Sequence, residues 1–148
     1  MAKSIVSQVQ LLPRTEDSAP WEAADHQLVP INLKRYGYVE EEYLYSGKAN
    51  VYTLKNGRAE IKTENADYTN RFILRKPENP AKFSGNVIVE LLNSTNSWDV
   101  SPMWCLLWQK MLQEGDIYIG VTVRAICTKA LKTFDPNRYE KVSWKNPS

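Results

Sequence analysis

The sequence has little histidine, cysteine and glycine, and these shortages exclude several kinds of site. Its 148 residues include one histidine, two cysteines and six glycines. With one histidine and no Cys-x-x-Cys or His-x-x-x-His pair, the chain has no ligand set for a structural zinc ion, and we expect no metal or other cofactor. Cys105 and Cys127 are too few for a disulfide framework, which favours a reducing, cytoplasmic location.

The chain also lacks a long apolar run and a strong net charge. No stretch is long enough to cross a bilayer, and residues 1–12 lack the apolar core and cleavage site of a secretory signal. There are 19 basic and 17 acidic residues, and the net charge of +2 is too small to indicate a nucleic-acid partner. We therefore expect neither a nucleic acid nor a membrane as a partner.

A serine nucleophile has no candidate in the sequence. No Gly-x-Ser-x-Gly elbow occurs, and Ser46-Gly47 and Ser84-Gly85 lie in predicted surface turns. The single histidine, His26, lies in a polar, irregular segment, where nothing places it beside a nucleophile and an orienting carboxylate. A surface or capping role is favoured for His26, and we predict no catalytic residue in this chain.

The front half of the chain predicts an irregular N-terminal arm over residues 1–35 and then antiparallel strands. Residues 36–46 alternate as a half-exposed strand does. Ser46-Gly47-Lys48 predicts a turn, and Asn56-Gly57 predicts a hairpin. The expected return strands are 58–63 and 69–75.

Three acidic residues lie within predicted strands. Glu40 and Glu42 share a face of the 36–46 strand, and a solvated face explains them better than a pair of catalytic acids. Glu90 lies inside an apolar strand, where burial demands a partner, so a structural ion pair or a sheet-edge position is favoured over catalysis.

The second half predicts a strand, a helix and a second strand, the right-handed crossover unit of parallel sheets. Residues 86–92 are apolar with little alternation, as in a central parallel strand covered on both faces, and 117–123 form the second strand. Between them, Ser101-Pro102 reads as a helix cap with Asp99 adding negative charge, and the helix ends near Glu114. Its apolar stripe is expected to lie on the sheet and contains Trp104, Leu107, Trp108 and Met111.

The remaining residues predict a short helix over 125–133, a turn at 135–137 and no closing strand. One crossover unit beside an antiparallel front is an incomplete doubly wound architecture, because parallel strands need helices on both faces. The expected fold class is therefore α/β, with antiparallel front strands leading into a parallel strand-helix-strand unit.

Candidate binding residues lie beyond the carboxyl ends of the two parallel strands, where open α/β sheets bind ligands. The polar loop after Leu92 could present backbone N–H groups to an anion, although a simple turn and helix cap explain it as well. Arg124 could meet a substrate carboxylate or phosphate, with a structural salt bridge as the alternative. Trp98 and Trp104 flank the loop and are candidates for pocket lining, although core packing explains helix aromatics equally well.

A family resemblance is carried by residues spread over 36–139. They are Tyr36-Gly37-Tyr38-Val39-Glu40-Glu41-Glu42-Tyr43, Ser46-Gly47-x-Ala49-Asn50-Val51-Tyr52, Tyr68-Thr69-x-Arg71, Pro80-Ala81-x-Phe83-x-Gly85-x-Val87-x-Val89-Glu90-x-Leu92-Asn93 and Asp135-Pro136-x-Arg138-Tyr139. In this order they resemble the opening of a family of alpha/beta-hydrolase-domain proteins. The resemblance implies that residues 36–148 are the N-terminal part of a serine-hydrolase domain whose nucleophile, acid and histidine lie downstream.

The resemblance also implies that the loop after residues 86–92 supplies an oxyanion-hole N–H group, and the candidates are Asn93, Ser94 and Thr95. We therefore predict part of an esterase-type hydrolase of a small-molecule ester, inactive on its own. The rest would come from the same chain or from a C-terminal partner chain. The alternative is a non-catalytic module that binds a sugar or an apolar ligand through its Trp and Tyr residues.

Overall fold

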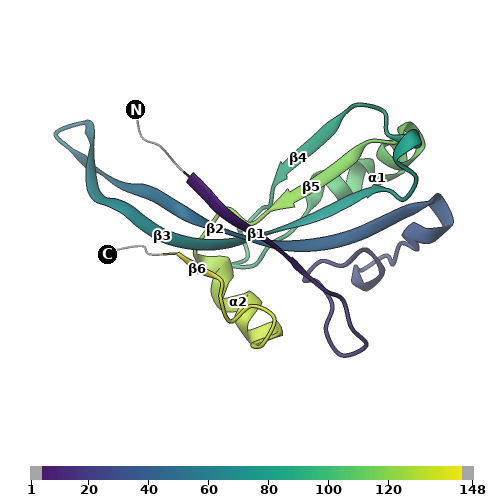
Figure 1. Ribbon diagram of the computed structural model, residues 1–148, viewed down its shortest axis with the longest axis horizontal. Helices are drawn as coiled ribbons and strands as arrows, with labels where there is room; N and C mark the ends of the chain where they lie inside the picture. The colour runs from purple at the N-terminus through teal and green to yellow at the C-terminus, as the bar shows by residue number, and fades with distance from the viewer. Residues whose placement is uncertain (1–4, 145–148) are drawn as a thin grey trace.

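The computed structural model describes residues 5–144 of the protein. Its main feature is one mixed β-sheet (Figure 1). The strands occur in the order β1-β2-β3-β5-β4, and β6 also pairs with β3. In chain order the elements are β1 (Ile5–Leu12), η1 (Ala24–His26), η2 (Leu33–Tyr36), β2 (Tyr38–Lys55), β3 (Arg58–Pro77), η3 (Pro80–Lys82), β4 (Val87–Leu91), α1 (Pro102–Glu114), β5 (Ile117–Val121), α2 (Ile126–Phe134) and β6 (Ser143–Trp144).

The predicted hairpin is confirmed, but it is much longer than expected. β2 and β3 are antiparallel and meet at Asn56-Gly57, where both residues have positive φ as a tight hairpin turn requires. The expected turn at Ser46-Gly47-Lys48 is wrong, because β2 runs through it unbroken. Gly47 lies opposite a bulge in β1, and a Cβ there would be 1.9 Å from the Ile5 carbonyl oxygen. The glycine therefore permits close backbone approach instead of a turn. The return strands expected at 58–63 and 69–75 are one strand, β3.

Both ends of the described chain join the sheet, contrary to expectation. The N-terminal arm begins with β1, which pairs antiparallel with β2, and residues near the C-terminus form β6 beside β3. Seven of the eight β1 side chains are exposed. Because burial on one face is what creates an alternating pattern, a strand held mainly by backbone pairing leaves little signal in the sequence.

The predicted strand-helix-strand unit is confirmed. β4 and β5 are parallel neighbours joined through α1, and the short helix expected at 125–133 is α2. α1 ends at Gly115, whose φ of 84° is left-handed and whose Cβ would lie 2.1 Å from the Lys82 carbonyl oxygen. A glycine is therefore required there both by the backbone conformation and by the neighbouring chain.

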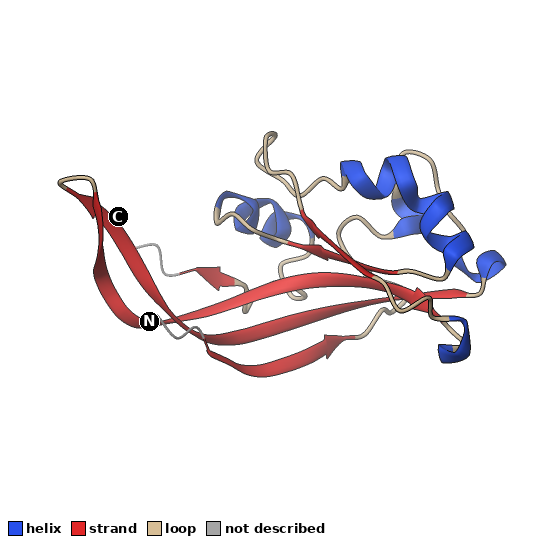
Figure 2. Ribbon diagram, turned by 90° about the horizontal axis from the view of Figure 1, so that it is seen from above, coloured by secondary structure: helices blue, strands red, loops and turns tan. Residues whose placement is uncertain are grey.

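The position expected for residues 86–92 is wrong, because β4 lies at the edge of the sheet and not at its centre. Val87, Val89 and Leu91 are 50%, 56% and 68% exposed. Both α1 and α2 lie on the same side of the sheet (Figure 2), so neither α-helix of residues 5–144 covers the opposite side. The apolar residues of β4 have the pattern of a strand that is buried on both faces, but residues 5–144 cover only one of them.

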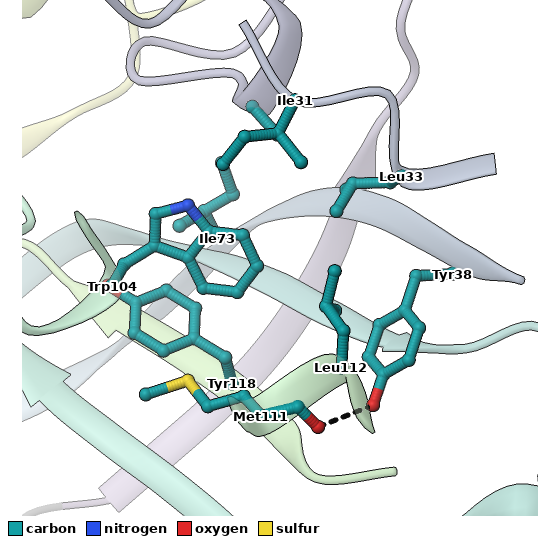
Figure 3. Close-up of a cluster of buried hydrophobic side chains, with 9 residues drawn as sticks. Ile31, Leu33, Tyr38, Ile73, Trp104, Met111, Leu112 and Tyr118 are labelled. Atoms are coloured by element: carbon teal, nitrogen blue, oxygen red, sulfur yellow. Dashed lines mark hydrogen bonds between the residues drawn. The ribbon is translucent and has the colours of Figure 1, made fainter. Parts of the chain in front are cut away.

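The main core lies between α1 and the sheet. Trp104 and Met111 of α1 pack against Ile73 and Tyr118, and the Tyr38 hydroxyl donates to the Met111 carbonyl at 3.1 Å (Figure 3). The predicted helix stripe is confirmed at Trp104, Trp108 and Met111, whereas Leu107 is exposed. A second core beneath α2 consists of Leu44, Leu131, Tyr139 and Val142.

Candidate functional site

The loop after β4 is closed at its base and leaves the Ser94 backbone N–H without an acceptor among residues 5–144. Asn93 and Val100 exchange two backbone hydrogen bonds of 2.8 and 2.9 Å. The Thr95 N–H donates to the Asn93 side-chain oxygen at 2.8 Å, and the Ser97 N–H donates to the Ser94 carbonyl. Of the three predicted oxyanion donors, only the Ser94 N–H has no acceptor among residues 5–144. Among these three candidates, Ser94 is therefore the one whose N–H is available to a ligand.

Asp99 anchors this loop to the sheet. Its Oδ2 accepts from Arg71 Nη2 at 2.9 Å and from the Thr122 hydroxyl, and its backbone carbonyl accepts from the Trp21 indole. Asp99 and Arg71 are both buried. The predicted role of Asp99, as a charge at the start of α1, is replaced by this contact with β3 and with the loop after β5.

Arg71 belongs to a buried ionic cluster. Glu42 accepts from Arg71 at 2.8 Å, from Arg138 at 2.6 Å and from the Tyr139 hydroxyl at 2.8 Å. Burial lowers the pKa of Arg71, but the nearby Glu42, Tyr139 and Asp99 outweigh it, and the net shift is upward. The solvated face predicted for Glu42 is wrong, because its side chain has no exposed surface. A charge removed from water in this way is retained only with close partners.

Glu40 is likewise paired and not solvated. It accepts from Arg75 Nε at 2.8 Å, and both side chains are almost fully buried. The Arg75 guanidinium lies 4.1 Å from the centre of the Trp104 ring, a cation–π contact. Trp104 has no exposed surface, so it is a core residue and not part of an open pocket.

Glu90 supplies the negative charge at the start of α1. Its two carboxylate oxygens accept from the Met103 and Trp104 backbone N–H groups at 2.8 and 3.1 Å, and the second also accepts from the Tyr118 hydroxyl. Of the two structural roles predicted for Glu90, the sheet-edge position is confirmed, because β4 is an edge strand. The predicted ion pair is wrong, because within residues 5–144 Glu90 accepts from helix N–H groups and not from a cation. Ser101, the predicted cap, makes no side-chain capping bond.

The other candidates lie apart from one another. Trp98 is 45% exposed and its ring centre lies 6.3 Å from that of Trp21, beside the polar loop. Arg124 is exposed after β5, and no ion pair to it occurs within residues 5–144. The pocket roles of Trp98 and Arg124 stay predictions. His26 is at the surface with its Nε2 4.0 Å from Asp25. No group of three potential metal ligands occurs in the part of the chain that is described.

The ionic cluster around Glu42 was not predicted from the sequence. Glu42, Arg71, Arg138 and Tyr139 all occur in the motifs that carry the family resemblance, in three separate runs. The structure brings these runs together around Glu42. The available signal was Arg71, a charge directly before the apolar residues Phe72, Ile73 and Leu74 of β3, since an unpaired buried charge is too costly to persist.

Comparison with known families agrees with this architecture. A model of the alpha/beta hydrolase domain matches residues 7–148, so the chain belongs to that family. No curated protein and no solved structure is significantly similar to the chain. In the described part of the chain, neither helix has the length and apolar character needed to cross a bilayer.

Proposed function

We propose that this chain is the front portion of an esterase-type serine hydrolase and supplies one donor of its oxyanion hole. The observation that carries the proposal is the unused Ser94 N–H in the loop after β4. Hydrolases of this fold take one oxyanion donor from the equivalent loop, and the chain belongs to their family. A small-molecule ester is the proposed substrate, with the tetrahedral oxyanion accepting from Ser94.

The anchoring of the loop supports this role. An oxyanion donor is effective only when its position is fixed before the reaction begins. Here the Asn93–Val100 bridge closes the loop and the buried Asp99 holds it to Arg71. The Thr95 N–H, also a predicted donor, stabilises the loop through Asn93 instead.

The nucleophile, acid and histidine of the proposed enzyme lie outside residues 1–148. Two features of the sheet support this: the free edge of β4, and the exposed apolar residues Val87, Val89 and Leu91. Unpaired strand edges and exposed apolar patches mark contact surfaces. We propose that further polypeptide, in the same chain or in a partner chain, covers both. A cytoplasmic location is part of the proposal, in keeping with two free thiols.

Size-exclusion chromatography with mass spectrometry of the native protein tests whether further polypeptide is present. A longer chain or a tightly bound second chain is expected. A native, stable, monomeric protein of 17.0 kDa would argue against a missing part.

A pair of substitutions at one position tests the oxyanion role in the native protein. Ser94→Ala keeps the backbone N–H, whereas Ser94→Pro removes it. Hydrolysis of p-nitrophenyl acetate should be little changed by the first and fall about 100- to 1,000-fold in kcat with the second. Equal activity in the two variants, with thermal unfolding showing both folded, would exclude Ser94 as a donor. Absence of ester hydrolysis by the native protein would exclude the proposed function.

A further inference from the structure

A hollow of about 390 Å³ lies between β2, β3 and β6, away from the loop after β4. Ala49 and Ala66 face each other across β2 and β3 and leave this space, because neither has a large side chain. Tyr45, Tyr68 and Trp144 line it with aromatic rings. Small-molecule sites in proteins are commonly about 300 to 1,000 Å³ and are lined mainly by apolar and aromatic side chains.

Asn70, in the wall of the hollow, has an acceptor with no partner. The residue is 3% exposed, and its Nδ2 donates to the Tyr45 hydroxyl at 2.7 Å and to the Thr122 carbonyl at 2.6 Å. Because a carbonyl can only accept, the orientation of the Asn70 amide is determined. Its Oδ1 is therefore left buried without a hydrogen-bond donor from the described part of the chain.

Two unused donors lie in the same wall. The Trp144 indole Nε1 is buried and has no acceptor among residues 5–144. The Tyr45 hydroxyl accepts from Asn70, and its own proton has no acceptor among the described residues. Buried polar groups in native proteins are nearly always paired, so two orphaned groups beside a tyrosine hydroxyl with a spare proton require an explanation.

We propose that this hollow binds a neutral, ring-shaped polyol with the chemistry of a single hexose unit. A hydroxyl group both donates and accepts, so adjacent hydroxyls can serve Asn70 Oδ1, Trp144 Nε1 and the Tyr45 hydroxyl together. An alkane could pair none of them, and a carboxylate could pair only the donors. The ligand is neutral because Asp67, the charged residue in the wall, is already paired with Lys48 at 3.1 Å.

Binding at this site needs a small adjustment of Trp144, since the orphaned atoms are shielded from bulk water. Trp144 belongs to the two-residue strand β6, which two register pairs hold against β3. The aromatic rings then pack on the apolar C–H face of the sugar while its hydroxyls pair the three groups. The site is separate from Ser94, so it does not rest on the proposed hydrolase activity.

Nuclear magnetic resonance of the 15N-labelled chain tests the proposal directly. The chain has five tryptophans, so five indole N–H resonances are expected, and Trp144→Phe identifies one of them. Titration with methyl β-glucoside, methyl β-galactoside and methyl α-mannoside should shift the Trp144 indole and the Asn70 side-chain amide in a saturable way for at least one glycoside. Cyclohexane, which has the ring but no hydroxyl, should shift neither resonance.

Calorimetry of matched variants supplies the second readout. Trp144→Phe keeps an aromatic wall and removes the N–H, and it should weaken glycoside binding roughly three- to tenfold, the effect of one hydrogen bond. Trp108→Phe is the control, because Trp108 packs against the core beneath α1 and does not line the hollow. The proposal is overturned if no glycoside moves the Trp144 resonance, or if both variants bind as the wild-type chain does.

Discussion

Arg71 Nη2 donates to Asp99 Oδ2 at 2.9 Å, and neither side chain has any exposed surface. This contact joins the middle of β3 to the loop that follows β4, although the two residues are 28 positions apart. The proposed oxyanion donor therefore depends on an ion pair in the core, and stability and function are linked through it.

Replacing Asp99 by Asn should destabilise the chain strongly. Arg71 would lose one of its two carboxylate partners inside the protein, and breaking a buried pair in this way costs about 3 kcal/mol. Urea unfolding followed by tryptophan fluorescence measures the loss. Glu60→Gln is the matched control, since it removes the exposed Lys55–Glu60 pair and should cost less than about 1 kcal/mol. An equal loss of unfolding free energy in the two variants would show that the buried pair stabilises the fold no more than the exposed pair does.

Glu90→Gln should weaken the start of α1. The carboxylate accepts from two helix N–H groups, whereas an amide presents a donor to one of them and carries no charge. We expect a loss of about 1 to 2 kcal/mol in the free energy of unfolding. Glu114→Gln, at the opposite end of the same helix, should be almost neutral. A larger effect at Glu114 than at Glu90 would contradict the capping role.

The two cysteines should differ sharply in reactivity. Cys105 is exposed on α1, whereas Cys127 is fully buried, and burial together with the negative Asp99 raises the pKa of the Cys127 thiol to about 12. Because the thiolate is the reactive form, Ellman's reagent should modify one thiol in the folded chain and two in urea. Rapid modification of two thiols without denaturant would contradict the burial of Cys127.

Alkaline pH should destabilise the fold through its buried tyrosines. Burial raises the pKa of Tyr38 to about 12, and it also raises the pKa values of Tyr118 and Tyr139. These hydroxyls ionise in the unfolded chain near pH 10 but stay protonated in the folded chain. Their contribution to stability is therefore complete below pH 10 and declines as the pH rises above it.

Absorbance at 295 nm, read alongside circular dichroism, measures this effect. Of the eight tyrosines, these three should ionise only as the secondary structure is lost. Ionisation of all eight before any loss of secondary structure would contradict the predicted link between burial and alkaline unfolding.

Local patterns predicted some elements well. The Asn56-Gly57 turn and the helix bounded by Pro102 and Gly115 depend on residues that act within a few positions, so the sequence displays them. Gly47 was misread because a glycine that admits a neighbouring strand looks the same in sequence as one that makes a turn.

Long-range pairing could not be predicted in the same way. Glu42 looked solvated because its partners are far along the chain, with Arg71 at 29 and Arg138 at 96 positions away. For β4, the apolar pattern indicates burial on both faces, but it does not indicate which polypeptide covers the face formed by Val87, Val89 and Leu91. Similarly, the sequence predicted an oxyanion role for the loop after β4, and the structure adds that the Ser94 N–H is unused whereas the Thr95 N–H is occupied.

The most direct test of the central claim is to treat the native protein and the 148-residue chain with a fluorophosphonate probe and to map the label by peptide mass spectrometry. The account predicts stoichiometric labelling of one serine outside residues 1–148 in the native protein and no labelling of the isolated chain. Stoichiometric modification of any serine within residues 1–148 would contradict it, because the nucleophile would then lie in the part that we assign only to the oxyanion loop and the sheet.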